Sequence, residues 1–192
     1  MKGFYTKFCP QKVTLLKNMV GELLENTKEG RKIDQADPDT QKAIQLSKDV
    51  IGDFSENPSA WECRYQILVI FDVYWHEELE FITLLAKKDP CNPCLWRYRR
   101  RVIEKLGENA ASLELNFTEE ILTLDARNQY AWVHRKWVLQ SFEGWKDELT
   151  FCRELIENDN YNCFAWKQRE TRPVSGDAAF DTRPVSGDTA SV

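Results

Sequence analysis

Two cysteines separated by two residues, Cys91 and Cys94, form the motif that most directly suggests metal or redox chemistry. A zinc site needs further ligands, but the chain has only two histidines, His76 and His134, and no His, Asp and Cys set with zinc-ligand spacing. The six cysteines are scattered along 192 residues, which argues against a disulfide framework. We therefore predict free thiols with structural or incidental roles, and no metal held by this chain.

Basic side chains gather in the run RYRRR at 97–101, which could attract phosphates or an acidic peptide. The alternative, which we favour, is a solvated helix face paired with acidic residues on the first helix of a helical hairpin. His134 is interpreted as a hydrogen-bonded structural residue rather than a base. The sequence contains no glycine-rich phosphate loop and no nucleophile elbow.

The overall composition limits the classes of partner. With 26 basic and 31 acidic residues the net charge is −5, which favours neither a nucleic-acid backbone nor an anionic membrane. The longest apolar run, ILVIF at 67–71, is too short to span a bilayer, and the start MKGFYTKFCP lacks an apolar signal core. We expect a cytoplasmic protein whose partners are proteins or small molecules, with no nucleic acid and no membrane span.

The elements that must position these side chains are copies of one pattern, Asn-x-x-x-Trp-x-x-Arg. Its four copies begin at Asn57, Asn92, Asn128 and Asn162, and successive tryptophans are 35, 36 and 34 residues apart. A second pattern, Glu-Leu-x-Phe, precedes three of the copies and begins at Glu78, Glu114 and Glu148. A period in this range is typical of a repeat architecture.

Each repeat is predicted to be a pair of helices. Apolar residues upstream of each Asn, such as Leu79, Ile82 and Leu85, have helical spacing, and a second apolar stripe follows each Trp. Short polar side chains at the junction can cap the second helix, and Gly107 and Gly144 are placed to end it. The prediction is an all-α protein, a right-handed superhelical stack of antiparallel helical hairpins without strands.

The Trp and Arg of each copy are interpreted as parts of this scaffold. One helical turn places both on nearby faces of the second helix. The indole can then fill the gap between two helices, while the guanidinium reaches a carboxylate or a free carbonyl group. Packing and capping are therefore the roles that we predict for the repeated residues.

The sequence resembles the alpha-subunit repeats of protein prenyltransferases, and among them the alpha subunit shared by farnesyltransferase and type I geranylgeranyltransferase. The resemblance covers about residues 40–170 and is strongest at 104–169. Family members read Trp-x-His-Arg-x-Trp-Val in this stretch, which Trp132, His134, Arg135, Trp137 and Val138 match. Four copies in phase make the signal specific.

The resemblance implies a heterodimer in which this helical subunit forms a crescent around a barrel-like beta subunit. The beta subunit is expected to hold zinc, which activates the cysteine of a C-terminal CaaX motif, and most of the isoprenoid pocket. Zinc, with magnesium as a further candidate, is thus expected in the complex and no cofactor in this chain. The choice between farnesyl and geranylgeranyl is expected to lie in the beta subunit.

The resemblance also implies three site residues. A family Lys that reaches the isoprenoid diphosphate is Arg127 here, and a fixed cation there stabilises the charge of the departing diphosphate. Gln129 stands where the family has Tyr, Tyr130 follows it, and Pro93 replaces the corresponding Tyr of the preceding repeat. Arg127 is predicted to be catalytic, and Gln129 and Tyr130 to bind substrate. From the residues alone, Arg127 could equally be a solvated side chain at a helix junction.

The chain is predicted to consist of an N-terminal helix and linker (1–39), four repeats (40–170) and a disordered tail (171–192) in which TRPVSGD occurs twice. Because family members continue beyond a fourth repeat, we expect a truncated or diverged member whose last hairpin lacks a full second helix. Three functions remain open. They are the alpha subunit of a CaaX prenyltransferase, a non-catalytic helical-repeat adaptor derived from such a subunit, and a protein similar to the alpha subunit of Rab geranylgeranyltransferase.

Overall fold

The structure is a computed structural model that describes residues 5–34, 36–72 and 75–171. Within these residues the chain forms α-helices and one 3-10 turn, and no strand. The helices are α1 (Tyr5–Lys28), α2 (Pro38–Asp53), α3 (Pro58–Phe71), α4 (Trp75–Lys88), α5 (Pro93–Leu106), α6 (Ala111–Leu124), α7 (Gln129–Phe142), α8 (Glu148–Asn158) and α9 (Cys163–Glu170), with the turn η1 (Gly107–Ala110) between α5 and α6. The all-α prediction is confirmed.

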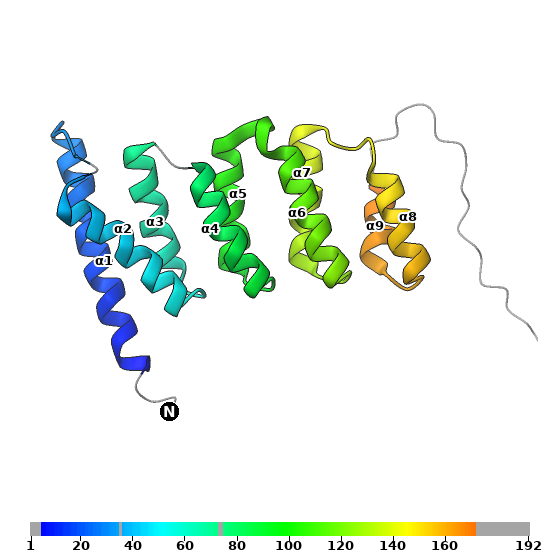
Figure 1. Cartoon of the computed structure of the whole chain (residues 1–192), viewed down its shortest axis with the longest axis horizontal. Coiled ribbons are helices and arrows are strands. Elements are labelled where there is room, and N and C mark those ends of the chain that lie inside the picture. Colours follow the sequence, from blue (N-terminus) through cyan, green and yellow to red (C-terminus); the bar gives the residue numbers. More distant parts are fainter. Residues whose placement is uncertain (1–4, 35, 73–74, 172–192) are drawn as a thin grey trace, which may run out of the picture.

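From α2 onward the helices form four antiparallel hairpins in a row, α2/α3, α4/α5, α6/α7 and α8/α9 (Figure 1). The second helices of neighbouring hairpins, α3, α5, α7 and α9, contact one another along the row, and α1 packs against both α2 and α3. The loops inside the hairpins lie along one edge, the lower edge in Figure 1. This arrangement confirms the predicted stack of hairpins and brings the four Asn-containing junctions to that edge.

Each repeated Asn starts the second helix of its hairpin. The Oδ1 atoms of Asn57, Asn92 and Asn162 accept hydrogen bonds from backbone amides two and three residues further on, and Asn128 Oδ1 accepts from Ala131 N at 3.0 Å. These bonds satisfy amides that the first turn of a helix leaves without partners. The Nδ2 atoms of Asn128 and Asn162 also donate to Pro90 O and Ala126 O of the preceding hairpin. The Asn therefore caps one hairpin and ties it to the previous one.

The repeated tryptophans lie between helices as predicted. Trp61, Trp96 and Trp132 are only 3%, 5% and 4% exposed, whereas Trp166 in the last hairpin is half-buried. Each indole Nε1 donates to the carbonyl oxygen six residues earlier in the chain, at 2.7–2.9 Å. The ring thus fills the space between helices while its polar atom closes the junction loop.

Only one of the two predicted helix-ending glycines acts in that way. Gly107 ends α5 with a φ of 69°, a backbone conformation that glycine adopts without strain. The prediction for Gly144 is wrong, because α7 ends at Phe142 and the residue that caps it is Glu143, which adopts a left-handed φ of 55°. Gly144 instead packs closely against α6, since a Cβ there would lie 2.9 Å from Leu115 Cδ1 and the leucine side chain would have to shift.

The ends of the row differ from its middle. The helix expected within the first 39 residues is α1, which shares a separate apolar cluster with α2 and α3 that includes Leu16, Ala43 and Ile67. The last second helix, α9, has eight residues, whereas α3, α5 and α7 each have 14. The predicted TRPVSGD tail lies outside the described residues. No helix in the described part of the chain is long and apolar enough to cross a membrane.

Candidate functional site

Buried ion pairs join the hairpins. The guanidinium of Arg64 in α3 binds Glu78 in α4, Arg99 in α5 binds Glu114 in α6, and Arg135 in α7 binds Glu148 in α8. The Arg99 Nε–Glu114 Oε1 distance is 2.5 Å, and the Arg135 Nη2–Glu148 Oε2 distance is 2.8 Å. All six side chains are at most 5% exposed. The first three of the four repeated arginines therefore link their own hairpin to the first helix of the next one.

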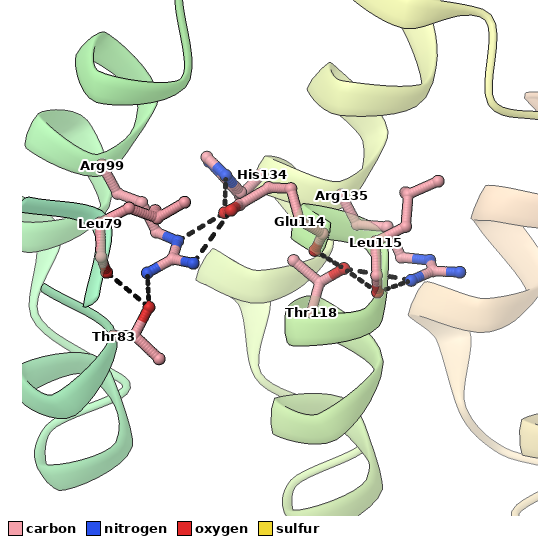
Figure 2. A network of polar contacts seen from close by, with 8 residues as sticks. All are labelled: Leu79, Thr83, Arg99, Glu114, Leu115, Thr118, His134 and Arg135. Atoms are coloured by element: carbon pink, nitrogen blue, oxygen red, sulfur yellow. Dashed lines mark hydrogen bonds and ion pairs between the residues drawn. The ribbon is translucent and has the colours of Figure 1, made fainter. Parts of the chain in front are cut away.

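Two more side chains complete each ion pair. The Nη1 atom of each Arg donates to a hydroxyl group of the first helix in its own hairpin, from Ser47, Thr83 or Thr118. Each Glu also binds the residue two positions after the Trp of its own hairpin, which is Tyr98, His134 or Gln168. Figure 2 shows this network around Glu114, between Arg99 and His134. The carboxylates are thus enclosed and fully hydrogen-bonded, as buried charges require.

This network was only half predicted. The sequence indicated that each Arg would reach a carboxylate or a carbonyl group, which is confirmed for Arg64, Arg99 and Arg135, and that His134 is structural. It did not indicate that the partner is the Glu of the Glu-Leu-x-Phe pattern. The available signal was the spacing, because Glu78, Glu114 and Glu148 recur in step with Arg64, Arg99 and Arg135, each 13 to 15 residues after its Arg.

The interpretation of RYRRR as a solvated face is wrong for its centre. Tyr98 and Arg99 are each 1% exposed and belong to the buried network. Arg100 is exposed and Arg101 is half-buried, so the predicted solvation holds for them. Neither pairs with a first helix as predicted, because Arg100 binds Glu104 of its own helix α5 and Arg101 binds Glu62 of the second helix α3. The period of the helix explains the difference, because five consecutive residues necessarily face all sides of an α-helix.

The buried network shifts two pKa values downward. Burial lowers the pKa of His134 below its ordinary value of 6.5 and outweighs its hydrogen bond to Glu114, because Arg99 already neutralises that carboxylate. Burial opposes ionisation of Glu114, but Arg99 and His134 together hold the pKa of this carboxyl group below its ordinary value of 4.5. His134 is therefore neutral at pH 7 and donates Nε2–H to an ionised Glu114.

Acid is expected to weaken the fold through His134. The pKa of His134 is lower in the folded than in the unfolded chain. The contribution of neutral His134 to the free energy of unfolding is therefore complete above pH 6.5, and it is lost as the pH falls from 6.5 towards the pKa of the folded chain. In that interval the free energy of unfolding should fall by up to about 1.4 kcal/mol per pH unit. Urea unfolding at pH 7.5 and 5.5 measures this, with His134→Gln as control because Gln168 serves at the same position. An equal loss of stability in the wild type and in His134→Gln would contradict the assignment of this pH dependence to His134. The other histidine, His76, is exposed and is not expected to contribute.

The Cys91-x-x-Cys94 motif lies at the junction between α4 and α5. The Cys94 Sγ–Glu56 O distance is 3.5 Å, and Cys91 Sγ accepts from Asn128 Nδ2 at 3.7 Å. Both are free thiols, as are the other three described cysteines. Among the described residues no group of three or more His, Cys, Asp and Glu could hold a metal ion, so these side chains do not fit zinc.

The predicted site residues lie together at the loop edge, in the α6–α7 junction. Arg127 points into solvent with 60% of its side chain exposed, and its Nη2 is 2.6 Å from Asp159 Oδ2 in the α8–α9 junction. Gln129 is the exposed first residue of α7, and Tyr130, next to it, is half-buried against the core. None of the three lines any of the cavities of about 290, 620 and 700 Å³ found elsewhere in the described chain. The exposed cation of Arg127 thus lies apart from these three cavities.

The repeat pattern matches a known family. The family model described as "Protein prenyltransferase alpha subunit repeat" matches residues 75–106 and 112–142, which contain the hairpins α4/α5 and α6/α7. The chain contains protein prenyltransferase alpha-subunit repeats. The resemblance that the tryptophan register predicted is confirmed, and these two repeats hold the network of Figure 2 together with Gln129 and Tyr130.

Curated relatives match a large part of the chain. The protein farnesyltransferase/geranylgeranyltransferase type-1 subunit alpha of Pisum sativum is 42% identical over 130 residues, which cover 68% of this chain and 39% of the relative. The Arabidopsis thaliana subunit of the same name is 40% identical and covers 70% of this chain and 41% of the relative. The geranylgeranyl transferase type-2 subunit alpha of Rattus norvegicus is 32% identical over 111 residues, 53% of this chain and 19% of the relative. The chain thus spans about two fifths of the plant prenyltransferase subunits.

A solved structure has the same fold. It is the Candida albicans protein geranylgeranyltransferase-I complexed with GGPP, which matches with a TM-score of 0.62 and 24% sequence identity. The match covers 80% of this chain and 51% of the Candida albicans chain. At this level of identity the similarity supports the prenyltransferase repeat fold of the chain.

Proposed function

We propose that the chain is the alpha subunit of a heterodimeric CaaX protein prenyltransferase, which transfers farnesyl or geranylgeranyl to a C-terminal cysteine. The observation that carries this proposal is the 42% identity to a type-1 alpha subunit across 130 residues, 68% of this chain. In this role the row of hairpins is a rigid scaffold for a beta subunit. Zinc and most of the isoprenoid pocket belong to the beta subunit, and the protein acts in the cytoplasm.

Arg127 is the residue of this chain that we assign to the chemistry. Its exposed guanidinium lies at the loop edge, where a diphosphate held by a beta subunit can approach it. Negative charge grows on the diphosphate as its bond to the isoprenoid carbon breaks, and a positioned cation lowers the energy of that state. Gln129 and Tyr130, beside it, contact the isoprenoid or the CaaX peptide.

A non-catalytic adaptor is the second candidate. It is favoured by Gln129 and Pro93, which stand where the resemblance places tyrosines that contact substrate. An adaptor would use the same hairpins to bind a beta subunit or another protein without supporting turnover. The type-2 relatives make a Rab-directed enzyme the remaining alternative.

Replacing Arg127 by alanine is expected to lower kcat/KM for prenyl transfer about tenfold to a hundredfold, because one charge-stabilising donor is lost. The chain is co-expressed with a type-1 beta subunit, co-purified and assayed with a CaaX peptide. Co-purification should be unchanged, since 60% of the Arg127 side chain is exposed.

Arg100→Ala is the matched control, because Arg100 is similarly exposed and forms an ion pair, but lies on α5. Its kcat/KM is expected to equal that of the wild type. Co-purification of an inactive wild-type complex would select the adaptor, and full activity of Arg127→Ala would remove Arg127 from the mechanism. Activity on Rab proteins with a type-2 beta subunit, in place of CaaX peptides, would select the remaining alternative.

A further inference from the structure

We propose that Asp159 is a positioning residue that holds the Arg127 side chain ready for a diphosphate. This inference rests on the proposed function, because it concerns the same site. Asp159 Oδ2 accepts two hydrogen bonds from the Arg127 guanidinium, from Nε at 3.1 Å and from Nη2 at 2.6 Å. Its other oxygen, Oδ1, accepts from the backbone amide of Tyr161 at 3.0 Å. The carboxylate is therefore anchored to its own loop while it binds Arg127.

The backbone of Arg127 is held by a second aspartate. The amide of Arg127 donates to Asp125 Oδ1 at 3.1 Å, which is the same turn that Asp159 makes with Tyr161 one repeat later. Asp125 thus holds the backbone of Arg127, and Asp159 holds its guanidinium group. With both ends held, binding a ligand freezes fewer rotamers of a long and flexible side chain.

The pairing leaves the phosphate-binding edge of the guanidinium available. Asp159 occupies the edge formed by Nε and Nη2. The fork formed by Nη1 and Nη2 points away from that edge and matches two oxygens of a phosphate group. A guanidinium can bind a carboxylate on one edge and a phosphate on the other, whereas an ammonium group has no such separate edges.

The Arg127–Asp159 pair is not a general feature of the scaffold. The residue before the repeated Asn is Glu56, Cys91, Arg127 or Tyr161, and the residue three before the next Asn is Asp89, Asp125 or Asp159. Along the row these two positions bring together Glu56 and Asp89, then Cys91 and Asp125, and finally Arg127 and Asp159. Only the last combination has opposite charges. Two hairpin junctions form without the ion pair, so stacking does not require it. The pair is also exposed, and such pairs contribute little to stability.

The test uses the full chain and inorganic diphosphate, so that it does not depend on a beta subunit. Binding is followed by nuclear magnetic resonance, from the chemical shift of the Arg127 Nε–H group as diphosphate is added at constant ionic strength. Asp159→Asn keeps an oxygen for the Tyr161 amide but turns an NH₂ donor towards Arg127. We expect this variant to raise the Kd for diphosphate about threefold to tenfold, because Arg127 is then no longer held.

Matched variants separate positioning from charge. Asp125→Asn removes the same charge from the same edge while its oxygen still accepts from the Arg127 amide, and it is expected to change the Kd by less than about twofold. In the Arg127→Ala background, Asp159→Asn should not weaken binding at all, as followed there by isothermal titration calorimetry. Coupling of this kind is the mark of a residue that acts through another.

Four outcomes would overturn the inference: no binding of diphosphate to the wild type, tighter binding or an unchanged Kd in Asp159→Asn, or the same weakening with and without Arg127. Tighter binding would identify Asp159 as a competitor for the guanidinium. In the complex with a beta subunit, Asp159→Asn should raise KM for the isoprenoid diphosphate more than it lowers kcat. A chain that binds diphosphate as expected but fails to co-purify would disprove the proposed function and leave the role of Asp159 standing.

Discussion

Replacing Glu114 by alanine is expected to lower the free energy of unfolding by about 3–5 kcal/mol. Glu114 is fully buried and is the shared partner of Arg99 in the preceding hairpin and His134 in its own. Without the carboxylate, the Arg99 guanidinium remains as an uncompensated charge inside the protein, which is far less favourable than the same charge in water. Urea unfolding at pH 7.5, followed by circular dichroism at a helix wavelength, measures the loss.

The control for this prediction is Glu120→Ala on the same helix, α6. Glu120 is exposed and forms an ion pair with Lys87, so its removal should change stability by less than about 1 kcal/mol. Equal effects of the two substitutions would show that the buried carboxylate is not what joins the hairpins. Arg99→Met is a second check, because an apolar side chain avoids the unpaired guanidinium that Glu114→Ala leaves behind.

Replacing Trp96 by alanine is expected to lower the free energy of unfolding by about 3–5 kcal/mol. Its ring lies 5.9 Å from that of Phe117 and 5.2 Å from that of His134, measured between centroids, so it fills the space between two hairpins. The substitution leaves a cavity there and removes the hydrogen bond from Nε1 to Pro90 O. Thermal and urea unfolding of the two proteins, compared at one pH, measure the difference.

Trp166 provides the matched comparison at the end of the row. Its indole makes the equivalent hydrogen bond, to Asn160 O at 2.9 Å, but the ring is half-buried. Trp166→Ala is therefore expected to lower the free energy of unfolding by about 1–2 kcal/mol. A loss as large as that of Trp96→Ala would contradict the argument that burial between hairpins sets the size of the effect.

The candidate site was predictable from the sequence only as a set of positions. Arg127, Gln129 and Tyr130 are neighbours in the chain, so any fold of this junction places them together. Asp159 is 32 residues away, and nothing in the spacing of the repeats distinguishes its pairing with Arg127 from the combinations at the other junctions. The assignment of the three residues to substrate remains a proposal, which the experiments on Arg127 and Asp159 test.

The sequence by itself determined the helices of the repeats, the residue at which each second helix begins, and the repetition of the hairpins. Asn128 caps α7 by a hydrogen bond to the amide of Ala131, only three residues further on. The apolar stripe around Trp132 likewise repeats every three or four residues. Both signals join residues that are close in the sequence, so the sequence alone reveals them. Two local predictions still failed. Glu143 rather than Gly144 caps α7, and Arg99 is buried rather than solvated because it binds Glu114 of the next hairpin.

Only the tertiary structure decided which charges meet. Arg99 reaches Glu114, and Arg127 reaches Asp159, across the boundary between two hairpins. Whether such side chains meet depends on how far one hairpin is shifted and rotated against the next, and that register follows from the packing of whole helix faces. A repeat period states that hairpins stack, but the partner of each Arg is known only once the stack has formed.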